Sequence, residues 1–346
     1  SSGPPLAAES QPCYQWPMDD NGFCLRPLRA SDKAAVMAIS AKIWEGDDYL
    51  PHSFDDWVSD PDGLFNGCFV GDRLVGFGRV GFVAPGHAWL EGLRKDPDAG
   101  VSGVGRAVAV EGLRFLSGVH DLRSIRFSAY AHNPQTIAVN EALGFRRAGA
   151  WSIKSKRLPG SADGKEAFGA PAVAPSDRSG VSVRRVDPLD ASAAGRIRAA
   201  LTTGPWAAGF RLESWKAYPL EASPAIREDD LILEAVGSDG SVLGRLIGSL
   251  DPLKAQANVV AFGLESSSPS DASSASSDGL AAAALFAAFE RIASDAGYAY
   301  FEAIAPGLAG QREALDACGY ESWESEDDFL LYEWPAEWLG ELARPR

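Results

Sequence analysis

Positive charge is scarce in this chain of 346 residues. It has 32 Lys and Arg against 47 Asp and Glu, which gives a formal net charge of −15 at pH 7. Nucleic-acid phosphates require a basic surface, and anionic lipids attract basic segments. We therefore expect neither nucleic acid nor a membrane as a partner. An anionic ligand would need a local binding device, such as a helix N-terminus.

Cysteine, histidine and long apolar runs are also scarce. The four cysteines form no Cys-x-x-Cys pair and have no metal-ligand spacing with the four histidines, so we expect no disulfide framework and no metal. Free thiols are typical of a reducing compartment, which predicts a cytoplasmic location. No apolar run approaches membrane-spanning length. The sequence opens on SSGPPLAAES without Met, which leaves a removed targeting peptide open.

Length and internal similarity predict two domains of one type. A single hydrophobic core rarely serves a chain of this size. LRPLRASD (25–32) is echoed by VRRVDPLD (183–190), and NEALGF (140–145) by LDACGY (315–320). The aperiodic segment between the two halves is rich in Gly, Pro, Ala and Ser and reads as a linker. The predicted parts are an N-terminal extension (1–22), a first domain (23–158), a linker (159–180) and a second domain (181–346).

Local patterns in the first domain predict strands and helices in a mixed order. Two helices are expected early, one capped by Ser31 with an apolar stripe of Val36, Ile39 and Ile43, and one with a capping box at Ser53 and Asp56. Strands are expected over 68–82 with a turn at Gly71, then over 87–95 and 124–130; helices should begin after Gly103 and at Asn133-Pro134. This order predicts an α/β fold with a mixed sheet.

Two glycine motifs compete for the role of a phosphate loop. GFGRVG (76–81) fits the dinucleotide pattern, but the following FVAPGHAWLEG cannot start a helix, so we read it as a glycine-containing strand. DPDAGVSGVGRAVAVEGL (96–113) instead joins a strand to a helix. It has no Lys or Arg between Lys95 and Arg106, so backbone amides would have to hold an anion. A plain tight turn is the alternative.

The stretches LEGLRKDPDAGVSGVGRAV and NPQTIAVNEALGFRR resemble the acetyl-coenzyme A signature of the GNAT acetyltransferase superfamily. The resemblance implies a mixed-sheet α+β fold with acetyl-CoA as co-substrate. It implies that the main chains of Leu93 and Lys95 pair with the pantetheine arm and that Asn133 contacts the cofactor. It also implies that backbone amides cradle the pyrophosphate, namely those of Val101, Ser102, Gly103, Val104, Gly105 and Arg106.

The chain departs from that family pattern at two positions. Gly100 stands where the loop usually opens with Arg or Gln, which weakens the expected coenzyme A binding. Asn140 stands where a Tyr often protonates the leaving thiolate, so the general acid is unassigned. Tyr130 and His132, at the end of a strand, are candidates for that acid; core packing and helix capping are their alternative roles.

A narrower similarity lies upstream. IWEGDDYLPHSFDDWVSDPDG together with WLEGLR is similar to the histidine N-acetyltransferase family. That similarity implies acetylation of the α-amino group of a free amino acid, and a second, degenerate GNAT half. In agreement, SSSPSDASSASSDG (266–279) replaces the glycine loop of the second half and reads as a Ser-rich mobile loop. We therefore expect residues 181–346 to share the fold without cofactor chemistry.

Glu91 is the candidate general base, because an amine must lose a proton before it attacks a thioester. It lies two residues from Leu93 on one strand, so both side chains should share a face. A structural glutamate is the alternative. Asp47, Asp48 and Tyr49 could bind a cationic amine or form a solvated turn. Arg79 and Arg94 could bind a substrate carboxylate or form ion pairs with acidic neighbours.

These observations predict an acetyl-CoA-dependent N-acetyltransferase acting on a small amine, with the α-amino group of a free amino acid such as histidine as the favoured acceptor. Acetylation of a peptide or protein N-terminus is the first alternative, since an acidic surface tolerates a basic peptide. A non-catalytic acyl-CoA sensor or scaffold is the second, motivated by Gly100, Asn140 and the degenerate half. Glu91 counts against it. The sequence leaves the oligomeric state open.

Overall fold

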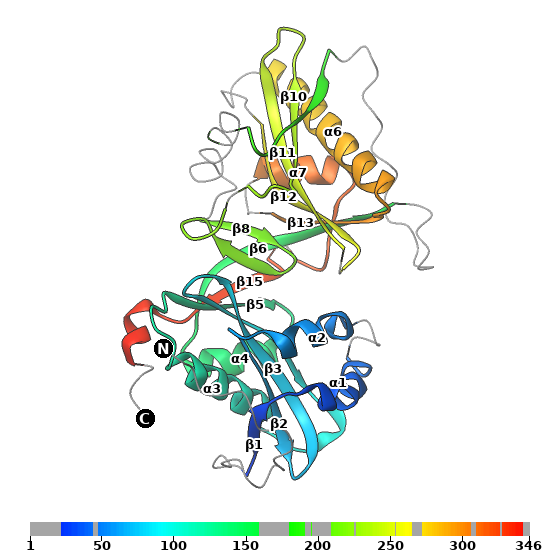
Figure 1. The fold of residues 1–346 in the computed structure, drawn as a ribbon. Helices are drawn as coiled ribbons and strands as arrows, with labels where there is room; N and C mark the ends of the chain where they lie inside the picture. The colour runs from blue at the N-terminus through cyan, green and yellow to red at the C-terminus, as the bar shows by residue number, and fades with distance from the viewer. Residues whose placement is uncertain are drawn as a thin grey trace. The chain divides into compact units, whose positions relative to one another are not determined.

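The computed structural model divides the chain into two compact units. The residues that it describes are 22–43, 48–158, 180–190, 195, 209–224, 226–252, 254–264, 272–305, 309–325 and 327–341. The first unit comprises Ser1–Phe127, Asn133–Arg146 and Tyr332–Arg346, and the second comprises Ser128–His132 and Arg147–Leu331. Figure 1 shows the elements of both units along the chain. Most of the predicted extension and linker (1–21 and 159–179) lie outside the described residues.

The first unit contains a sheet with the strand order β1-β2-β3-β4-β5. Neighbouring strands are antiparallel up to β4, and β4 and β5 are parallel. The strands are β1 (Cys24–Pro27), β2 (Leu64–Val70), β3 (Arg73–Ala84), β4 (His87–Lys95) and β5 (Ser124–Tyr130). The helices are α1 (Lys33–Ser40), α2 (Leu50–Ser59), α3 (Val104–Leu116) and α4 (Pro134–Leu143), with short 3₁₀ segments at Ala30–Asp32, Pro97–Ala99 and Ala336–Glu341. The mixed sheet that the sequence predicted is confirmed.

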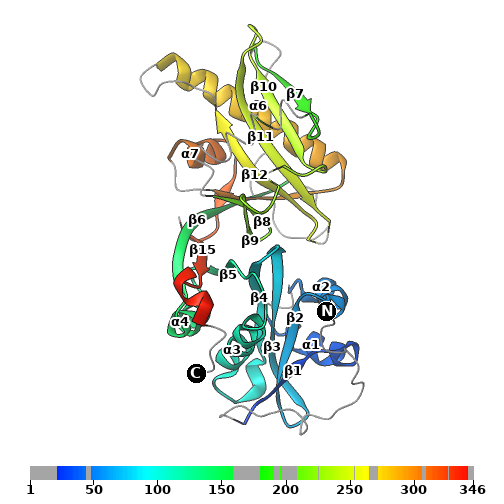
Figure 2. The same ribbon diagram turned by 60° about the vertical axis from the view of Figure 1, so that its left-hand side comes forward.

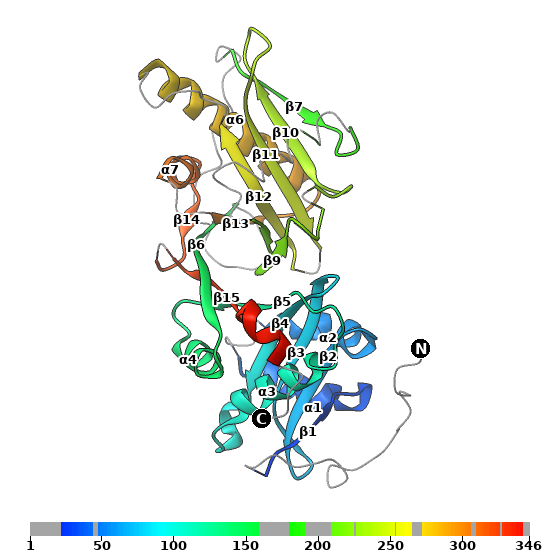
Figure 3. The same ribbon diagram turned by 90° about the vertical axis from the view of Figure 1, so that its left-hand side faces the viewer.

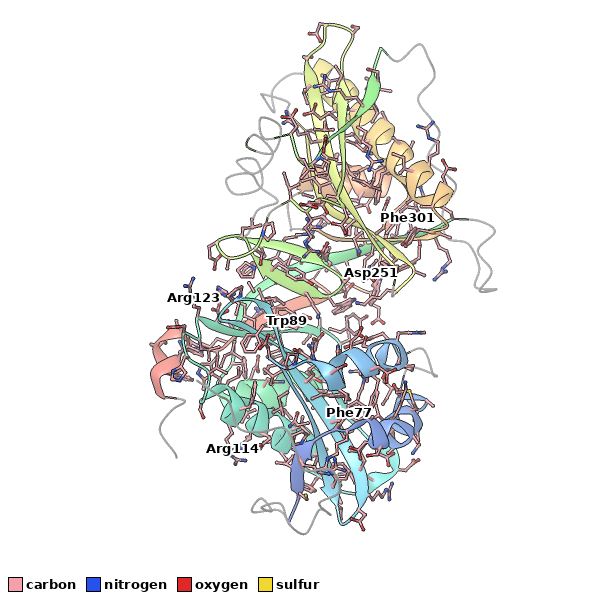
Figure 4. The ribbon with its side chains drawn as sticks, viewed as in Figure 1. Phe77, Trp89, Arg114, Arg123, Asp251 and Phe301 are labelled. Atoms are coloured by element: carbon pink, nitrogen blue, oxygen red, sulfur yellow. The ribbon has the colours of Figure 1, made fainter. Side chains whose placement is uncertain are left out.

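Helices cover both faces of this sheet, and each face has its own apolar cluster. On one face α1 and α2 bury Val36, Ile39, Phe54 and Trp57 against Phe77 of β3. On the other face α3 packs Val104, Ala107 and Val108 against the sheet. Figure 2 shows the two helix layers on opposite sides of β2 and β3. Figure 4 labels Phe77 and Trp89, two of the large buried side chains of this unit.

From β10 on, the second unit repeats the element order that the first unit has from β2 on. Its sheet runs β6-β13-β12-β11-β10-β7, with β12 and β13 parallel as β4 and β5 are. Helix α6 lies along β10, β11 and β12, as Figure 3 shows. The elements are β6 (Arg146–Arg157), β7 (Ser182–Val186), β8 (Phe210–Glu213), β9 (Lys216–Pro219), β10 (Leu231–Val236), β11 (Val242–Asp251), β12 (Gln256–Leu264), α6 (Ala272–Asp295), β13 (Tyr300–Ala305), α7 (Ala309–Ala317), β14 (Glu321–Ser322) and β15 (Phe329–Glu333).

The two repeats exchange segments. The end of the first repeat, residues 147–157 of β6, belongs to the second unit, where Arg157 pairs with Tyr300 at the start of β13. The C-terminal segment Tyr332–Arg346 belongs to the first unit, where the Trp334 amide donates to the carbonyl oxygen of Ile125 at 2.8 Å. The two compact units therefore differ from the predicted domains 23–158 and 181–346, each of which is a continuous range.

Both predicted starts of the early helices are wrong. Ser31 lies inside a 3₁₀ turn, and α1 begins two residues later, with Asp32 at its N-cap position. Asp32 accepts from the Arg29 amide at 2.8 Å and pairs with Arg26, so this carboxylate does the local bonding expected of Ser31. Helix α2 begins at Leu50 with Pro51 in its first turn. Ser53 is therefore an interior residue of this helix. Pro51 favours the earlier start, because the fixed φ of a proline suits the first turn of a helix.

The Ser-rich segment of the second half is helical where it is described. We expected a loop over 266–279, but α6 begins at Ala272. Ser costs little in a helix, and this helix gains much more by burying Leu285, Phe286 and Phe289 in the core of the unit. Residues 265–271 lie outside the described part, so the absence of cofactor chemistry from this half stays a prediction.

Candidate active site

The turn between β4 and α3 has the backbone of an anion-binding loop. Gly100 and Gly103 both have positive φ, 67° and 85°, and Gly103 is the N-cap of α3. Non-glycine residues rarely adopt this conformation. The amides of the first helical turn have no acceptor within their own helix, so they are available to a ligand. A Cβ added at Gly103 would come no closer than 3.7 Å to Phe23, so there is open space beside the backbone.

Basic side chains from elsewhere in the chain offset the acidic residues of this turn. Asp96, at the N-cap of the 3₁₀ segment, accepts from the Asp98 amide, from Lys42 at 2.9 Å and from Arg73 at 2.7 Å. Lys42 also pairs with Asp98 at 2.8 Å. Burial alone would raise the pKa of Asp96, but the hydrogen bonds from Lys42 and Arg73 lower it to about 2. Sequence reasoning missed Lys42 and Arg73, because no local pattern links them to the loop.

A bulge in β4 separates the two residues that the sequence placed on one face. Glu91 lies opposite Arg79 of β3, but Arg94 lies opposite Phe77, so Gly92 and Leu93 together oppose a single residue. Gly92 has a φ of 66°. A bulge reverses the alternation of side chains. Leu93 therefore packs with the α3 cluster, whereas Glu91 and Arg94 point to the α1 and α2 face. The expected shared face of Glu91 and Leu93 is wrong.

Glu91 belongs to a chain of ion pairs on the α2 face. One guanidinium nitrogen of Arg79 donates to Glu91, and another donates to Asp60 at the end of α2. The same guanidinium lies over the Trp57 ring, 5.1 Å from its centroid. The sequence offered the register of the β3–β4 hairpin as a signal for the pairing of Arg79 with Glu91, but it gave none for Asp60.

Asp48, Tyr49 and Arg94 form a second polar group on this face. The Asp48 side chain is 1% exposed; it accepts from Ser40 at 2.6 Å and from Arg94 at 3.1 Å. Arg94 lies 5.6 Å from the centroid of the Tyr49 ring. Burial and, next, the charge of Glu91 raise the pKa of the Tyr49 phenol, which therefore stays protonated. Asp47 lies outside the described residues.

The remaining cofactor candidates lie around the turn and at α4. Leu93 is partly buried, while Lys95, Ser102 and Arg106 are exposed. Asn133 caps α4, since its side-chain oxygen accepts from the Thr136 amide at 3.2 Å. Asn140, in place of the family Tyr, is buried and donates to the Thr136 carbonyl at 2.9 Å.

Tyr130 belongs to the second unit. Its ring contacts His132, Trp215 and Trp323. Burial and, next, a hydrogen bond with Glu324 raise the pKa of its phenol. Glu91, in contrast, belongs to the first unit.

Two further observations concern the described residues alone. No group of three or more His, Cys, Asp or Glu side chains among them could hold a metal ion. No helix within the same ranges is long and apolar enough to cross a membrane.

The bulged strand, the glycine turn and the N-terminus of α3 all lie in the part of the chain that matches a family model. Residues 33–145 match the profile of the acetyltransferase (GNAT) family. Residues 33–145 therefore belong to a GNAT acetyltransferase domain. Comparison with curated protein sequences gives no match.

Several solved structures align over about nine-tenths of this chain. A GCN5-related N-acetyltransferase from Sphaerobacter thermophilus aligns over 92% of this chain and 96% of its own, with a TM-score of 0.60 and 15% identity. A tandem GNAT protein of the clavulanic acid pathway aligns over 91% and 98%, with a TM-score of 0.50 and 17% identity. A glucosamine N-acetyltransferase region of a fungal multi-domain β-N-acetylglucosaminidase aligns over 90% of this chain and 38% of its own, with a TM-score of 0.56 and 13% identity. At these identities the likeness shows the fold.

Proposed function

We propose that the first unit transfers the acetyl group of acetyl-CoA to the amino group of a small amine, with Glu91 as the general base. The observation that carries this proposal is the position of Glu91, next to the bulge of β4 and 9% exposed, on the face opposite α3. The glycine turn and α3 would hold the cofactor from the other face. A carboxylate beside the acyl group could take the proton that the amine must lose.

For the cofactor we propose the set that the family resemblance implies. The amides of residues 101–106 would bind the pyrophosphate, and the main chains of Leu93 and Lys95 would pair with the pantetheine arm. Neutralisation of Asp96 and Asp98 by Lys42 and Arg73 supports this assignment, because it removes a repulsive charge from the approach of a polyanion. We also propose that Asn133 contacts the cofactor.

We place the acceptor amine on the sheet face that α1 and α2 cover, and the charge of that face suits an amine. Its three carboxylates, Asp48, Asp60 and Glu91, outnumber its two guanidinium groups, Arg79 and Arg94, by one negative charge. An ammonium ion approaching this face is attracted before it gives up its proton. From the resemblance to histidine N-acetyltransferase we propose the α-amino group of a free amino acid as the acceptor, bound near Asp48 and Tyr49.

One observation favours the alternative of a peptide N-terminus. Arg79 and Arg94, the two candidates for binding a substrate carboxylate, are already paired with Asp60, Glu91 and Asp48. An acceptor without a free α-carboxylate needs neither of them.

For the general acid we propose Tyr130. Its phenol carries a proton that a leaving thiolate could accept. We also propose a cytoplasmic location, which is supported by the free thiol of Cys318.

The test is a screen of free amino acids, simple amines and short peptides with acetyl-CoA, following thiol release and identifying the product by mass. Acetylation of free amino acids supports the first candidate, and acetylation restricted to peptides supports the alternative. Acetyl-CoA binding without thiol release for any acceptor would contradict both and indicate an acyl-CoA sensor.

A further inference from the structure

We propose that Arg79 is a positioning residue for Glu91, and that Asp60 in turn holds Arg79. The inference rests on the proposed function, in which Glu91 is the base. It means that the side chains on the sheet face beside α2 contribute to the reaction as well as packing the helix on the sheet. Arg79 would act through Glu91 and would not touch the substrate.

The geometry of the ion pairs carries the first step. Arg79 and Glu91 face each other directly across β3 and β4, on the strand pair just before the bulge. Arg79 spends one terminal nitrogen on Glu91 and the other on Asp60. Its side chain is 12% exposed, and its guanidinium carbon lies over the Trp57 ring. A planar guanidinium with two carboxylate partners and an aromatic neighbour has one orientation available. The carboxylate of Glu91 is thereby fixed at one end.

Three glycines make room for this arrangement. A Cβ at Gly81 would come within 2.6 Å of the Arg79 guanidinium, and one at Gly63 within 2.5 Å of an Asp60 carboxylate oxygen. A Cβ at Gly92 would come within 2.6 Å of the Trp57 ring. Each glycine therefore leaves room for one side chain of the group formed by Trp57, Asp60 and Arg79. A surface ion pair needs no such clearance, because its side chains can turn toward solvent.

The charged and titratable groups that face Glu91 come from several elements. Tyr49 precedes α2, Asp60 ends α2, Arg79 lies on β3, and Arg94 follows on β4 itself. Arg126 of β5 pairs with Glu333. Among these groups Arg79 makes the direct ion pair with Glu91.

The experiment is a double-mutant cycle of Arg79→Gln and Glu91→Gln on the best acceptor from the screen. Arg79→Gln should lower kcat about 10-fold or more, because a displaced base loses alignment with the amine. KM for acetyl-CoA should stay within about twofold of wild type, since the cofactor is bound on the other face. In the Glu91→Gln background the same change should cause no further loss, because Arg79 would act only through that carboxylate. Arg79→Lys should recover part of the rate, and Asp60→Asn should lower it less than Arg79→Gln.

Arg26→Gln is the matched control. Arg26 is also a strand arginine, 11% exposed, bonded to one carboxylate at two positions and stacked over Phe69 at 4.0 Å. Its loss should lower the melting temperature as much as Arg79→Gln does, with kcat and the pH–rate profile unchanged. If Arg79→Gln behaves like this control, or if its loss adds fully to that of Glu91→Gln, the positioning role is wrong and Glu91 can still be the base. If Glu91→Gln keeps full turnover, the assignment of Glu91 as the base in the proposed function fails.

Discussion

Lys156 and Glu290 form an ion pair in the core of the second unit. The ammonium nitrogen lies 2.9 Å from both carboxylate oxygens and donates to the Cys318 carbonyl at the same distance, and the Lys156 side chain is fully buried. Lys156 comes from β6, the exchanged strand of the first repeat, and Glu290 comes from α6 of the second. The pair thus fastens the exchanged strand to the helix that covers its new sheet.

Glu290→Gln should destabilise the second unit by about 3–5 kcal/mol, the range for removing one partner of a buried ion pair. The ammonium of Lys156 would remain buried without its countercharge. Urea unfolding measures the change. Arg146→Gln is the control, because Arg146 and Glu337 form an exposed pair at 3.1 Å whose loss should cost less than about 1 kcal/mol. Equal effects of the two variants would show that Lys156 and Glu290 contribute no more than a surface pair.

Gly103→Val should abolish acetyl-CoA binding while the protein stays folded. The branched side chain would stand where the diphosphate must approach, and its positive φ would strain the turn by about 1–2 kcal/mol. Gly71→Val is the control, because Gly71 also has a positive φ, 58°, and open space around it. Acetyl-CoA should raise the melting temperature of the control and leave that of Gly103→Val unchanged. A wild-type shift in Gly103→Val would locate the cofactor elsewhere.

Glu91→Gln should lower turnover about 10²-fold at neutral pH, because the amide cannot accept a proton. The loss should shrink as the pH rises, since more of the amine then arrives without its extra proton. Acetyl-CoA affinity should not change. The pH–rate profiles of wild type and variant give the comparison, and superimposed profiles would reduce Glu91 to a structural residue. The base would then be sought at His87, which is buried beside Ser124, at half-exposed His132, or among Asp47 and Asp48.

Asp96→Asn should lower stability at neutral pH by about 1.5–3 kcal/mol, the range for hydrogen bonds with a charged partner. The folded pKa of Asp96, about 2, lies below the ordinary value of an unfolded aspartate. The stabilisation is therefore present above pH ~4 and is lost as the pH falls toward 2. Urea unfolding of both proteins should show a difference at pH 7 that narrows between pH 4 and pH 2. A constant difference over that range would exclude the carboxylate charge as its cause.

Trp334→Ala should destabilise the first unit by about 3 kcal/mol, the low end for removing a large aromatic side chain. Trp334 packs edge-on against Phe145 and Trp338, with ring centroids 5.2 and 5.8 Å away. Trp323→Ala is the control, since Trp323 belongs to the second unit and is 40% exposed. The melting transition that acetyl-CoA stabilises should move to lower temperature in Trp334→Ala. If the control lowered the cofactor-stabilised transition more, the C-terminal segment would not support the first unit.

Local signals predicted the parts of the fold that local chemistry determines. Asn133-Pro134 starts α4 as expected, and β4 covers the expected 87–95. Pairings distant in the sequence had no such signal: Lys42 reaches Asp96 across 54 residues. The bulge at Gly92 also escaped prediction, because alternation along a strand assumes one residue for each position of the partner. A glycine in an otherwise regular strand was the available hint.

The exchange of β6 and the C-terminal segment makes each half of the polypeptide a component of the other's hydrophobic core. A single cleavage between residues 159 and 179 would yield two fragments, and each would carry a piece that the other lacks. The fragments should behave as an obligate heterodimer: neither folds alone, and the two reassemble when mixed. A gene split within this linker would thus encode a two-subunit enzyme, with acetyl-CoA turnover dependent on the concentration of both chains.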